Sequence, residues 1–197
     1  MLARRVAAGG LVVLAGVAAL RSNPEGDRVE VLVAARDLGS GTALSVDDVR
    51  LETRLATTVP DGSQADLNTV LGSTLASPTR RGEVLTDVRL LSSRLAESTA
   101  GPGARIVPLH LADSALIDLV RVGDVVDVLA APVTEPQPPT PAVSKVIATD
   151  AVVVLVSAKE KHSSSEGDRV VLVALPARVA NTVAGSALGQ TVTLTLH

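Results

Sequence analysis

Two classes of residue are missing from this chain of 197 residues: it has no phenylalanine, tyrosine or tryptophan, and it has no cysteine. Without aromatic rings the chain offers no stacking platform for nucleic-acid bases and no cage for quaternary ammonium ligands. An aromatic groove for proline-rich peptides is excluded for the same reason. Without cysteine it forms no disulfides and has neither thiolate nucleophiles nor zinc–thiolate sites.

A concentrated excess of positive charge is also lacking. Lysine and arginine number 18 against 21 aspartates and glutamates, so the net charge is −3, which argues against a nucleic-acid partner. The core has to come from the abundant valine, leucine and alanine, and valine-rich segments favour strands because branching at Cβ suits a pleated surface. We therefore predict a mostly β (α+β) protein with few helices.

An uncharged apolar segment, Val6–Leu20, stands near the start, with Arg4 and Arg5 before it and Arg21 after it. As a helix it would cover about 22 Å, short of the roughly 30 Å hydrocarbon core, and the flanking arginines can snorkel to cover part of the difference. We expect an uncleaved single-pass membrane anchor at residues 1–21. By the positive-inside rule everything after Arg21 is then extracytoplasmic, and the protein resides in the cell membrane.

A cleaved secretory signal peptide fits the same segment, because it too combines a basic start with a short apolar stretch. Val17 and Ala19 would then occupy the −3 and −1 positions of a cleavage site. The sequence leaves both interpretations open, and both export the rest of the chain. A buried core helix is a third interpretation, which the glycines and valines of the segment disfavour.

Two segments rich in small, polar and turn-forming residues divide the exported part. Residues 22–28 and 92–103 are predicted to be linkers. They separate a first domain at 29–91 from a second domain at 104–197, and each of these lies within the usual size range of a small domain.

In the first domain, the alternating valines of residues 29–33 predict a strand. The pattern Ser45-x-x-Asp48 predicts a short capped helical turn that leads into a second strand at 49–54. Residues 66–71 are expected to form another helical turn.

The segments that begin at Gly41 and Gly82 resemble each other. Gly41-x-x-Leu44-Ser45 is followed, after two residues, by Asp48-Val49-Arg50-Leu51, whereas Gly82-x-x-Leu85-Thr86 is followed directly by Asp87-Val88-Arg89-Leu90. Two copies are too few for a solenoid. We predict one structural unit that is used twice within the first domain.

The second domain is predicted to consist mainly of strands. A short helix is expected around residues 113–120, and a longer one at 177–188, with Pro176 at its start and Gly189 at its end. The proline-rich segment 132–142 is predicted to be a surface loop and the charged segment 159–168 a hairpin tip. Valine-rich or alternating runs place the strands at 105–111, 125–131, 144–148, 151–156, 170–175 and 191–196.

The order A-x-D-L-x-x-G-T-x-L-x-x-x-D-V, then Leu-Gly, then R-x-G-E-x-L-T, resembles the SAF domain, a small β-clip fold related to type III antifreeze protein and to the C-terminal part of sialic acid synthase. The resemblance covers nearly all of residues 29–91. The residues that carry it are Ala35, Asp37, Leu38, Gly41, Thr42, Leu44, Asp48, Val49, Leu71, Gly72, Arg81, Gly82, Glu83, Leu85 and Thr86.

The order of an apolar N-terminal segment, a SAF domain and this second block resembles the CpaB/RcpC family of Flp pilus (tight-adherence) assembly proteins. In the second domain the resemblance rests on Ala112-Asp-Ser-Ala, on Gly123-Asp124 with Val126-Asp127-Val128, and on the closing V-x-L-V-A-L-P and T-L-x-L. It implies a non-catalytic, membrane-anchored extracytoplasmic assembly factor whose partners are pilus or secretion-machinery proteins.

The sequence holds no pattern typical of catalysis or of a cofactor site. It has no G-x-S-x-G, no P-loop and no G-x-G-x-x-G after a strand. His110, His162 and His197 are far apart and lack metal-ligand spacing, so we predict that they are surface residues. We expect neither enzyme activity nor a metal or cofactor.

Charged pairs are the remaining candidates. We predict that Asp47-Asp48 caps a turn and that Asp124 and Asp127 occupy turn and strand-face positions rather than acting as an acid and a base. Arg80 and Arg81 precede the glycine of the second copy, where an arginine can hold a carboxylate or phosphate with two hydrogen bonds. They are the candidate ligand or partner residues, and a solvated turn is the alternative.

Two other functions stay open. One is a cell-wall glycan-binding protein, because SAF domains have relatives that handle sugars, although the lack of aromatic rings removes the usual stacking contact with a sugar. The other is a soluble periplasmic chaperone similar to the flagellar factor FlgA, which a cleaved N-terminus would favour.

Overall fold

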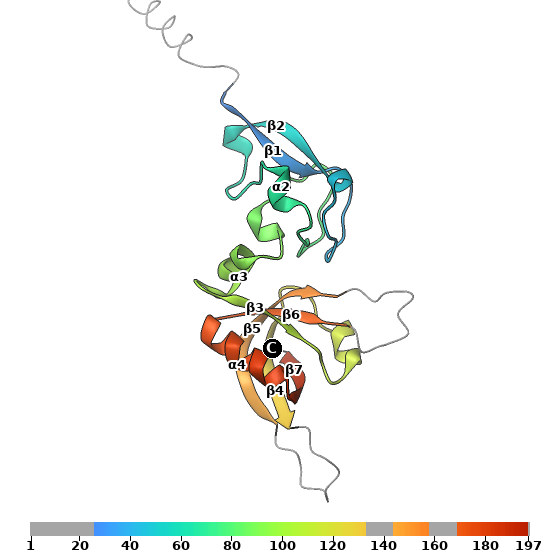
Figure 1. Ribbon diagram of the computed structural model, residues 1–197, viewed down its shortest axis with the longest axis vertical. Coiled ribbons are helices and arrows are strands. Elements are labelled where there is room, and N and C mark those ends of the chain that lie inside the picture. Colours follow the sequence, from blue (N-terminus) through green and yellow to red (C-terminus); the bar gives the residue numbers. More distant parts are fainter. Residues whose placement is uncertain (1–25, 133–143, 158–168, 197) are drawn as a thin grey trace, which may run out of the picture.

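The computed structural model describes residues 26–132, 144–157 and 169–196. Two β-rich domains follow each other along its longest axis, and helix α3 (Ser93–Ala100) lies between them (Figure 1). The predicted membrane segment Val6–Leu20 lies outside the described residues, as do the hairpin tip 159–168 and most of the loop 132–142. Within the described part of the chain, no helix is long and apolar enough to cross a membrane.

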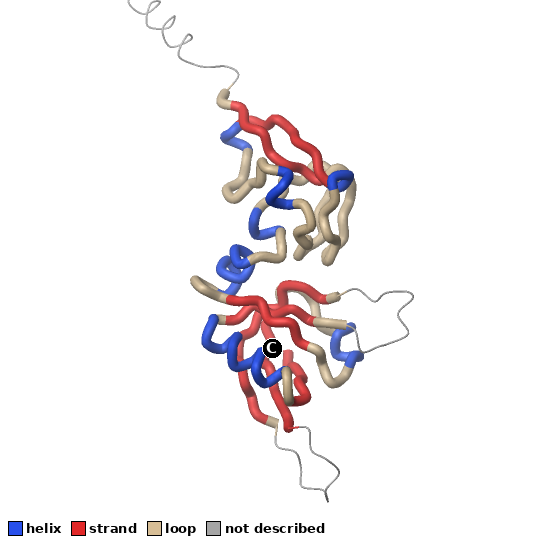
Figure 2. The backbone as a smooth tube through the Cα atoms, viewed as in Figure 1, coloured by secondary structure: helices blue, strands red, loops and turns tan. Residues whose placement is uncertain are grey.

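Strands dominate the described chain and its helices are short (Figure 2), which confirms the prediction of a mostly β protein. In the N-terminal domain, β1 (Arg28–Ala34) pairs antiparallel with β2 (Val49–Leu55). The rest of this domain consists of isolated bridges, turns and short helices. The short helices are the 3-10 helices η1 (Val46–Asp48), η2 (Ala56–Thr58) and η3 (Asp87–Arg89) and the α-helix α2 (Leu67–Val70).

The N-terminal domain has an internal pseudo-two-fold symmetry with an offset of 41 residues, the difference between Gly41 and Gly82. Ala34 N–H donates to Glu83 O at 3.0 Å, and Leu75 N–H donates to Thr42 O at 2.9 Å. Leu38 and Thr79 lie on the axis, because their N–H and C=O groups bond to each other in both directions at 2.9 Å. The predicted repeat is therefore one unit used twice. The two units cross at this pair.

The residue equivalence within the repeat differs from the one that the sequence suggested. Ala35 N–H donates to Asp48 O and Ala76 N–H to Arg89 O, so the structural counterpart of Asp48 is Arg89 rather than Asp87. The two units align without a gap. Gly41 and Gly82, at φ +80 and +83, are each followed by a buried leucine and then by a 3-10 helix of the same length. The shared letters Asp-Val-Arg-Leu are thus displaced by two positions in space.

Residues 92–103, predicted to be a linker of turn-forming residues, contain helix α3. Ser92 caps it by accepting a hydrogen bond from Leu95 N–H at 3.4 Å, and Gly101 ends it at φ +88. The helix packs on η3 of the N-terminal domain and on strands of the C-terminal domain, and Ala96 is buried there. The segment is therefore a helical junction in which the small side chain of Ala96 is buried.

The C-terminal domain is a five-stranded antiparallel sheet in the order β3-β6-β5-β4-β7. A parallel bridge from Leu111 to Val192 brings the chain after β3 against β7. Helix α4 (Ala177–Ala187) lies on the sheet through Val183, with Val179 and Ala187 beside it, as the predicted stripe requires. The strands are β3 (Arg105–Leu109), β4 (Val125–Pro132), β5 (Lys145–Val156), β6 (Val171–Leu175) and β7 (Gln190–Leu196), and the short helix η4 (Ser114–Asp118) follows β3.

The two strands predicted at 144–148 and 151–156 form one strand, β5. The residues between them make a bulge: Val126 pairs with Ala151 and Val128 with Ala148, so two residues oppose Asp127. Asp150 adopts φ +56, and its N–H donates to Asp127 Oδ1 at 3.2 Å. The carboxylate thus satisfies the backbone group that the bulge removes from the ladder, and the strand continues.

Candidate functional site

Arg80 and Arg81, the two candidates from the sequence, form a turn directly beside the pseudo-two-fold axis. Asp37 reaches them from the other unit: its Oδ2 accepts from Arg80 Nη1 at 2.7 Å and its Oδ1 from Arg81 N–H at 2.9 Å. The backbone hydrogen bond from Arg81, followed by the side-chain bond from Arg80, lowers the pKa of Asp37 below its ordinary 3.8. The turn therefore already holds a carboxylate of its own chain.

Glu83 fixes the same turn from its far side. Its Oε2 accepts from Arg80 N–H at 3.0 Å, and its Oε1 is ion-paired with Arg89. Arg89 Nη1 in turn donates to Ser77 Oγ at 2.7 Å. This network holds the backbone of the turn in place, so the side chains of Arg80 and Arg81 project from fixed backbone positions.

The guanidinium of Arg81 differs from that of Arg80, because Arg81 is exposed and makes no side-chain hydrogen bond or ion pair with another described residue. The Arg81 guanidinium acts on Asp37 through its charge alone. Its N–H groups can therefore take a carboxylate or phosphate with two hydrogen bonds. The pseudo-symmetric positions in the first unit are Gly39 and Ser40, which lack charge. Positive charge is therefore specific to one of the two units.

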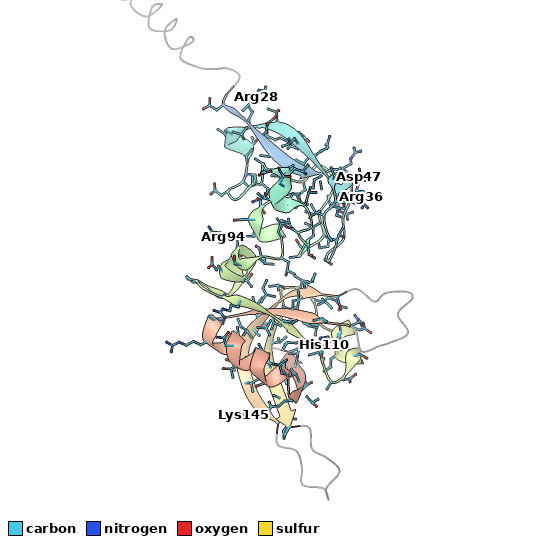
Figure 3. The ribbon with its side chains drawn as sticks, viewed as in Figure 1. Arg28, Arg36, Asp47, Arg94, His110 and Lys145 are labelled. Carbon is cyan, nitrogen blue, oxygen red and sulfur yellow. The ribbon has the colours of Figure 1, made fainter. Side chains whose placement is uncertain are left out.

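Asp48 is the buried charged residue of the N-terminal domain, with 2% of its surface exposed. Its Oδ2 accepts from Ser45 Oγ at 2.6 Å and from Ser45 N–H at 3.0 Å, and its Oδ1 accepts from Arg36 Nε at 2.8 Å. The Ser45 hydrogen bonds, followed by the Arg36 contact, lower the pKa of Asp48 below 3.8. The predicted capping role is confirmed for Asp48, whereas its neighbour Asp47 is exposed (Figure 3).

The other carboxylate pair also serves the backbone. Asp124 Oδ2 accepts from Arg121 N–H at 2.7 Å in the turn before β4, and Asp127 supports the bulge of β5. His110 is exposed just after β3 (Figure 3), and His162 and His197 lie outside the described residues. Within residues 26–132, 144–157 and 169–196, no three histidine, aspartate or glutamate side chains are grouped to hold a metal ion.

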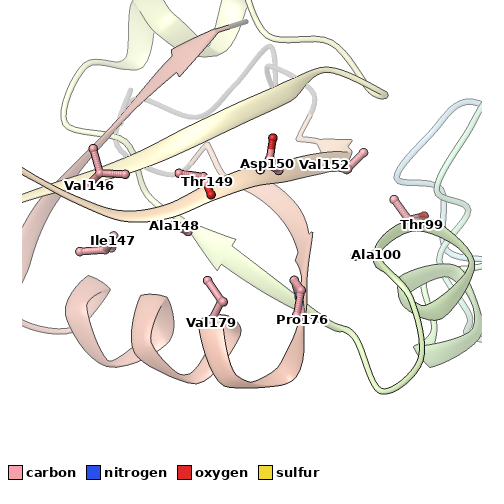
Figure 4. Close-up of a pocket in the computed structure, with 10 residues that line it drawn as sticks. All are labelled: Thr99, Ala100, Val146, Ile147, Ala148, Thr149, Asp150, Val152, Pro176 and Val179. Atoms are coloured by element: carbon pink, nitrogen blue, oxygen red, sulfur yellow. The ribbon is translucent and has the colours of Figure 1, made fainter.

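An open groove of about 510 Å³ lies where α3 meets the C-terminal domain (Figure 4). Thr99 and Ala100 line it from α3, β5 contributes one long wall, and Pro176 and Val179 line it from the start of α4. The lining is mostly aliphatic, with Asp150 at the bulge as its charged member. Such a groove can take a small aliphatic side chain or a segment of peptide.

Sequence reasoning missed this groove, because it depends on how two domains and a helix meet. The segment around Thr99 was predicted to be a linker, and the bulge at Asp150 was predicted to be a break between strands. The cap of α3 at Ser92 was the signal that could have found the helix, since serine is a preferred residue at the start of helices.

Comparison with known proteins identifies the first of the two domains. The SAF domain family model matches residues 29–91, so this part of the chain is a SAF domain, as predicted. Among solved structures, the flagellar protein FlgA from Thermotoga maritima MSB8 is 22% identical, with a TM-score of 0.32, over 43% of this chain and 31% of that one. The chain thus matches less than a third of that protein. No curated protein matches the chain.

Proposed function

We propose that this SAF-domain chain is a non-catalytic, membrane-anchored extracytoplasmic assembly factor of the CpaB/RcpC type that serves Flp pilus biogenesis. The observation that carries the proposal is the SAF domain followed by a separate β-rich domain, with α3 packed on both. This order agrees with the resemblance found in the sequence, in which an apolar segment precedes the SAF domain.

The chemistry of the described surface supports a binding role. The carboxylates of Asp37, Asp48 and Asp124 all accept backbone hydrogen bonds, and Asp37 and Asp48 are also ion-paired with arginines. Such groups hold turns in place. The features of the described surface that are available to other molecules include the exposed guanidinium of Arg81, the aliphatic groove beside α3 and the exposed backbone edge described below. Surfaces of this kind position a partner protein.

Replacing Arg81 by alanine is expected to weaken binding of an acidic partner group by about tenfold or more, because a charge-assisted hydrogen bond contributes about 1.5–3 kcal/mol. The fold should not change, because Asp37 bonds to the backbone N–H of Arg81 and not to its side chain. The measurement is the amount of pilin assembled on the surface of cells whose only copy carries the substitution, at matched protein level.

Arg178→Ala is the matched control, because Arg178 is an exposed arginine on α4 whose side chain forms no ion pair with another described residue. Its surface pilin should equal that of the unchanged protein. Equal pilin levels for Arg81→Ala and the unchanged protein would remove Arg81 from the proposal.

Cell fractionation with N-terminal sequencing tests the anchor. An uncleaved chain in the membrane fraction supports it, whereas a mature soluble protein that begins near Leu20 would favour the FlgA-like chaperone.

Sedimentation with purified peptidoglycan tests the glycan-binding alternative. Co-sedimentation would favour that alternative over the assembly factor.

A further inference from the structure

The outer edge of strand β2 is open. In the described part of the chain, β2 pairs with β1 alone. Ala56 N–H, directly after β2, donates to Asp27 O on the β1 side at 2.8 Å. Because backbone directions alternate along an antiparallel strand, the N–H and C=O groups of Leu51 and Thr53 point away from β1. The domain therefore presents a row of backbone donors and acceptors to the outside.

The second pseudo-symmetric unit has no such edge. Leu91 N–H donates to Thr74 O at 2.7 Å, which begins the counterpart of the β1–β2 ladder. That counterpart ends at once, because Ser92 caps helix α3. The open edge of β2 is thus specific to the first unit, just as Arg80 and Arg81 are specific to the second unit.

The side chains on this edge are exposed and alternate in character. Leu51 and Leu55 are 52% and 40% exposed on one face of the strand. On the other face Glu52 lies 2.8 Å from Arg54 in an ion pair whose side chains are 32% and 37% exposed. Exposed leucines on an unpaired edge are uncommon, since natural sheets usually cover or charge such edges to prevent pairing.

The sequence Leu51-Glu52-Thr53-Arg54-Leu55 is complementary to itself when two copies run antiparallel about Thr53. Leu51 then lies opposite Leu55, Glu52 opposite Arg54, and Thr53 opposite its own copy. Both kinds of facing pair are favourable across strands. Every one of the five positions has a matched partner.

We propose that the β2 edge pairs with the β2 edge of a second copy of this chain, joining the two-stranded sheets of two SAF domains into one four-stranded antiparallel sheet. The outward groups of Thr53 bond to those of Thr53 in the second copy, and those of Leu51 bond to Leu55. This surface goes beyond the assembly role proposed above and does not depend on it.

The charges select this register over its neighbour. With the two-fold axis at Glu52, glutamate would face glutamate and Arg50 would face Arg54, and like charges directly opposite each other are destabilising. With the axis at Thr53, each Glu52 keeps its own Arg54 and gains the Arg54 of the second copy. Because each Glu52 is also ion-paired with its own Arg50, the two Arg50–Glu52–Arg54 clusters become one network across the contact.

Cross-linking at Thr53 tests the contact directly, because the natural chain contains no cysteine. Directly opposed residues in a hydrogen-bonded antiparallel pair have Cα atoms about 5.5 Å apart, within the range of a disulfide. Full-length Thr53→Cys protein in membranes should form a covalent dimer on mild oxidation. Leu51→Cys should not, because in this register the two copies of residue 51 are about 13 Å apart along the strands.

A covalent dimer of Leu51→Cys without one of Thr53→Cys would overturn the register. The absence of both dimers, or cross-linking of Thr53→Cys only to a different protein, would overturn the proposal. Thr69→Cys, at an exposed position on α2 rather than on β2, is the control for random collision and should stay monomeric.

Charge exchange provides a second test that does not require a new bond. Glu52→Arg places arginine opposite arginine twice and should weaken association by about tenfold or more. The double variant Glu52→Arg/Arg54→Glu restores opposite charges across the contact and should restore association. Sedimentation of full-length protein in detergent, with circular dichroism to verify folding, gives both results. A folded single variant that associates like the unchanged protein would contradict the proposed contact.

Discussion

Replacing Leu85 by alanine is expected to lower the free energy of unfolding of the SAF domain by about 3–4 kcal/mol. Leu85 is fully buried, and its backbone bonds to both Leu32 and Gln64 at the centre of the second unit. The neighbouring segments therefore cannot move inward to fill the space left by the leucine side chain without breaking those hydrogen bonds. A cavity remains, and the contacts of the lost methyl groups are lost with it.

Denaturation followed by far-ultraviolet circular dichroism measures this loss, because the chain has no tryptophan or tyrosine to report by fluorescence. Leu71→Ala is the matched control in the same domain, since Leu71 is 39% exposed. It should change the stability by less than about 1 kcal/mol. A Leu85→Ala loss no larger than that of the control would mean that the repeated glycine–leucine unit does not build the core.

Replacing Asp48 by asparagine is expected to lower the stability of the same domain by about 2 kcal/mol at neutral pH, because hydrogen bonds to a charged group contribute about 1.5–3 kcal/mol. The amide keeps the size of the side chain but cannot accept from both Ser45 and Arg36 as a carboxylate does. Asp47→Asn is the control in the same helical turn, because Asp47 is exposed. Its stability should stay close to that of the unchanged protein.

The effect of Asp48 should depend on pH in a defined direction. Its pKa is lowered in the folded protein, so its contribution is fully present above the ordinary value of 3.8 and is lost as the pH falls through the lower, folded value. The unchanged protein and Asp48→Asn should therefore converge in stability in strong acid. A difference that persists undiminished in acid would show that the carboxylate charge is not the cause.

Local patterns predicted local structure well in this chain. Ser45 and Asp48 are three residues apart and cap one turn, so their relation is written in the sequence. The stripe that contains Val183 was found for the same reason. The contact of Asp37 with Arg80 spans 43 residues, because it depends on two units crossing at a pseudo-two-fold axis. No pattern within either unit could reveal it.

Shifts of register were the other source of error. The sequence aligned the two copies by their shared letters, whereas the hydrogen bonds of the structure make Arg89 the counterpart of Asp48. The bulge at Asp150 made one strand resemble two. In both cases the hydrogen bonds of the backbone, rather than the identity of the side chains, determined which residues correspond or pair.

Pilus assembly in cells that lack this chain tests the proposed function most directly. Surface pilin should fall to background in the deletion strain while prepilin is still made, because the defect lies in assembly. The full chain supplied from a plasmid should restore surface pilin. Normal amounts of surface pilin in the deletion strain would contradict the assignment of this SAF-domain protein to Flp pilus biogenesis.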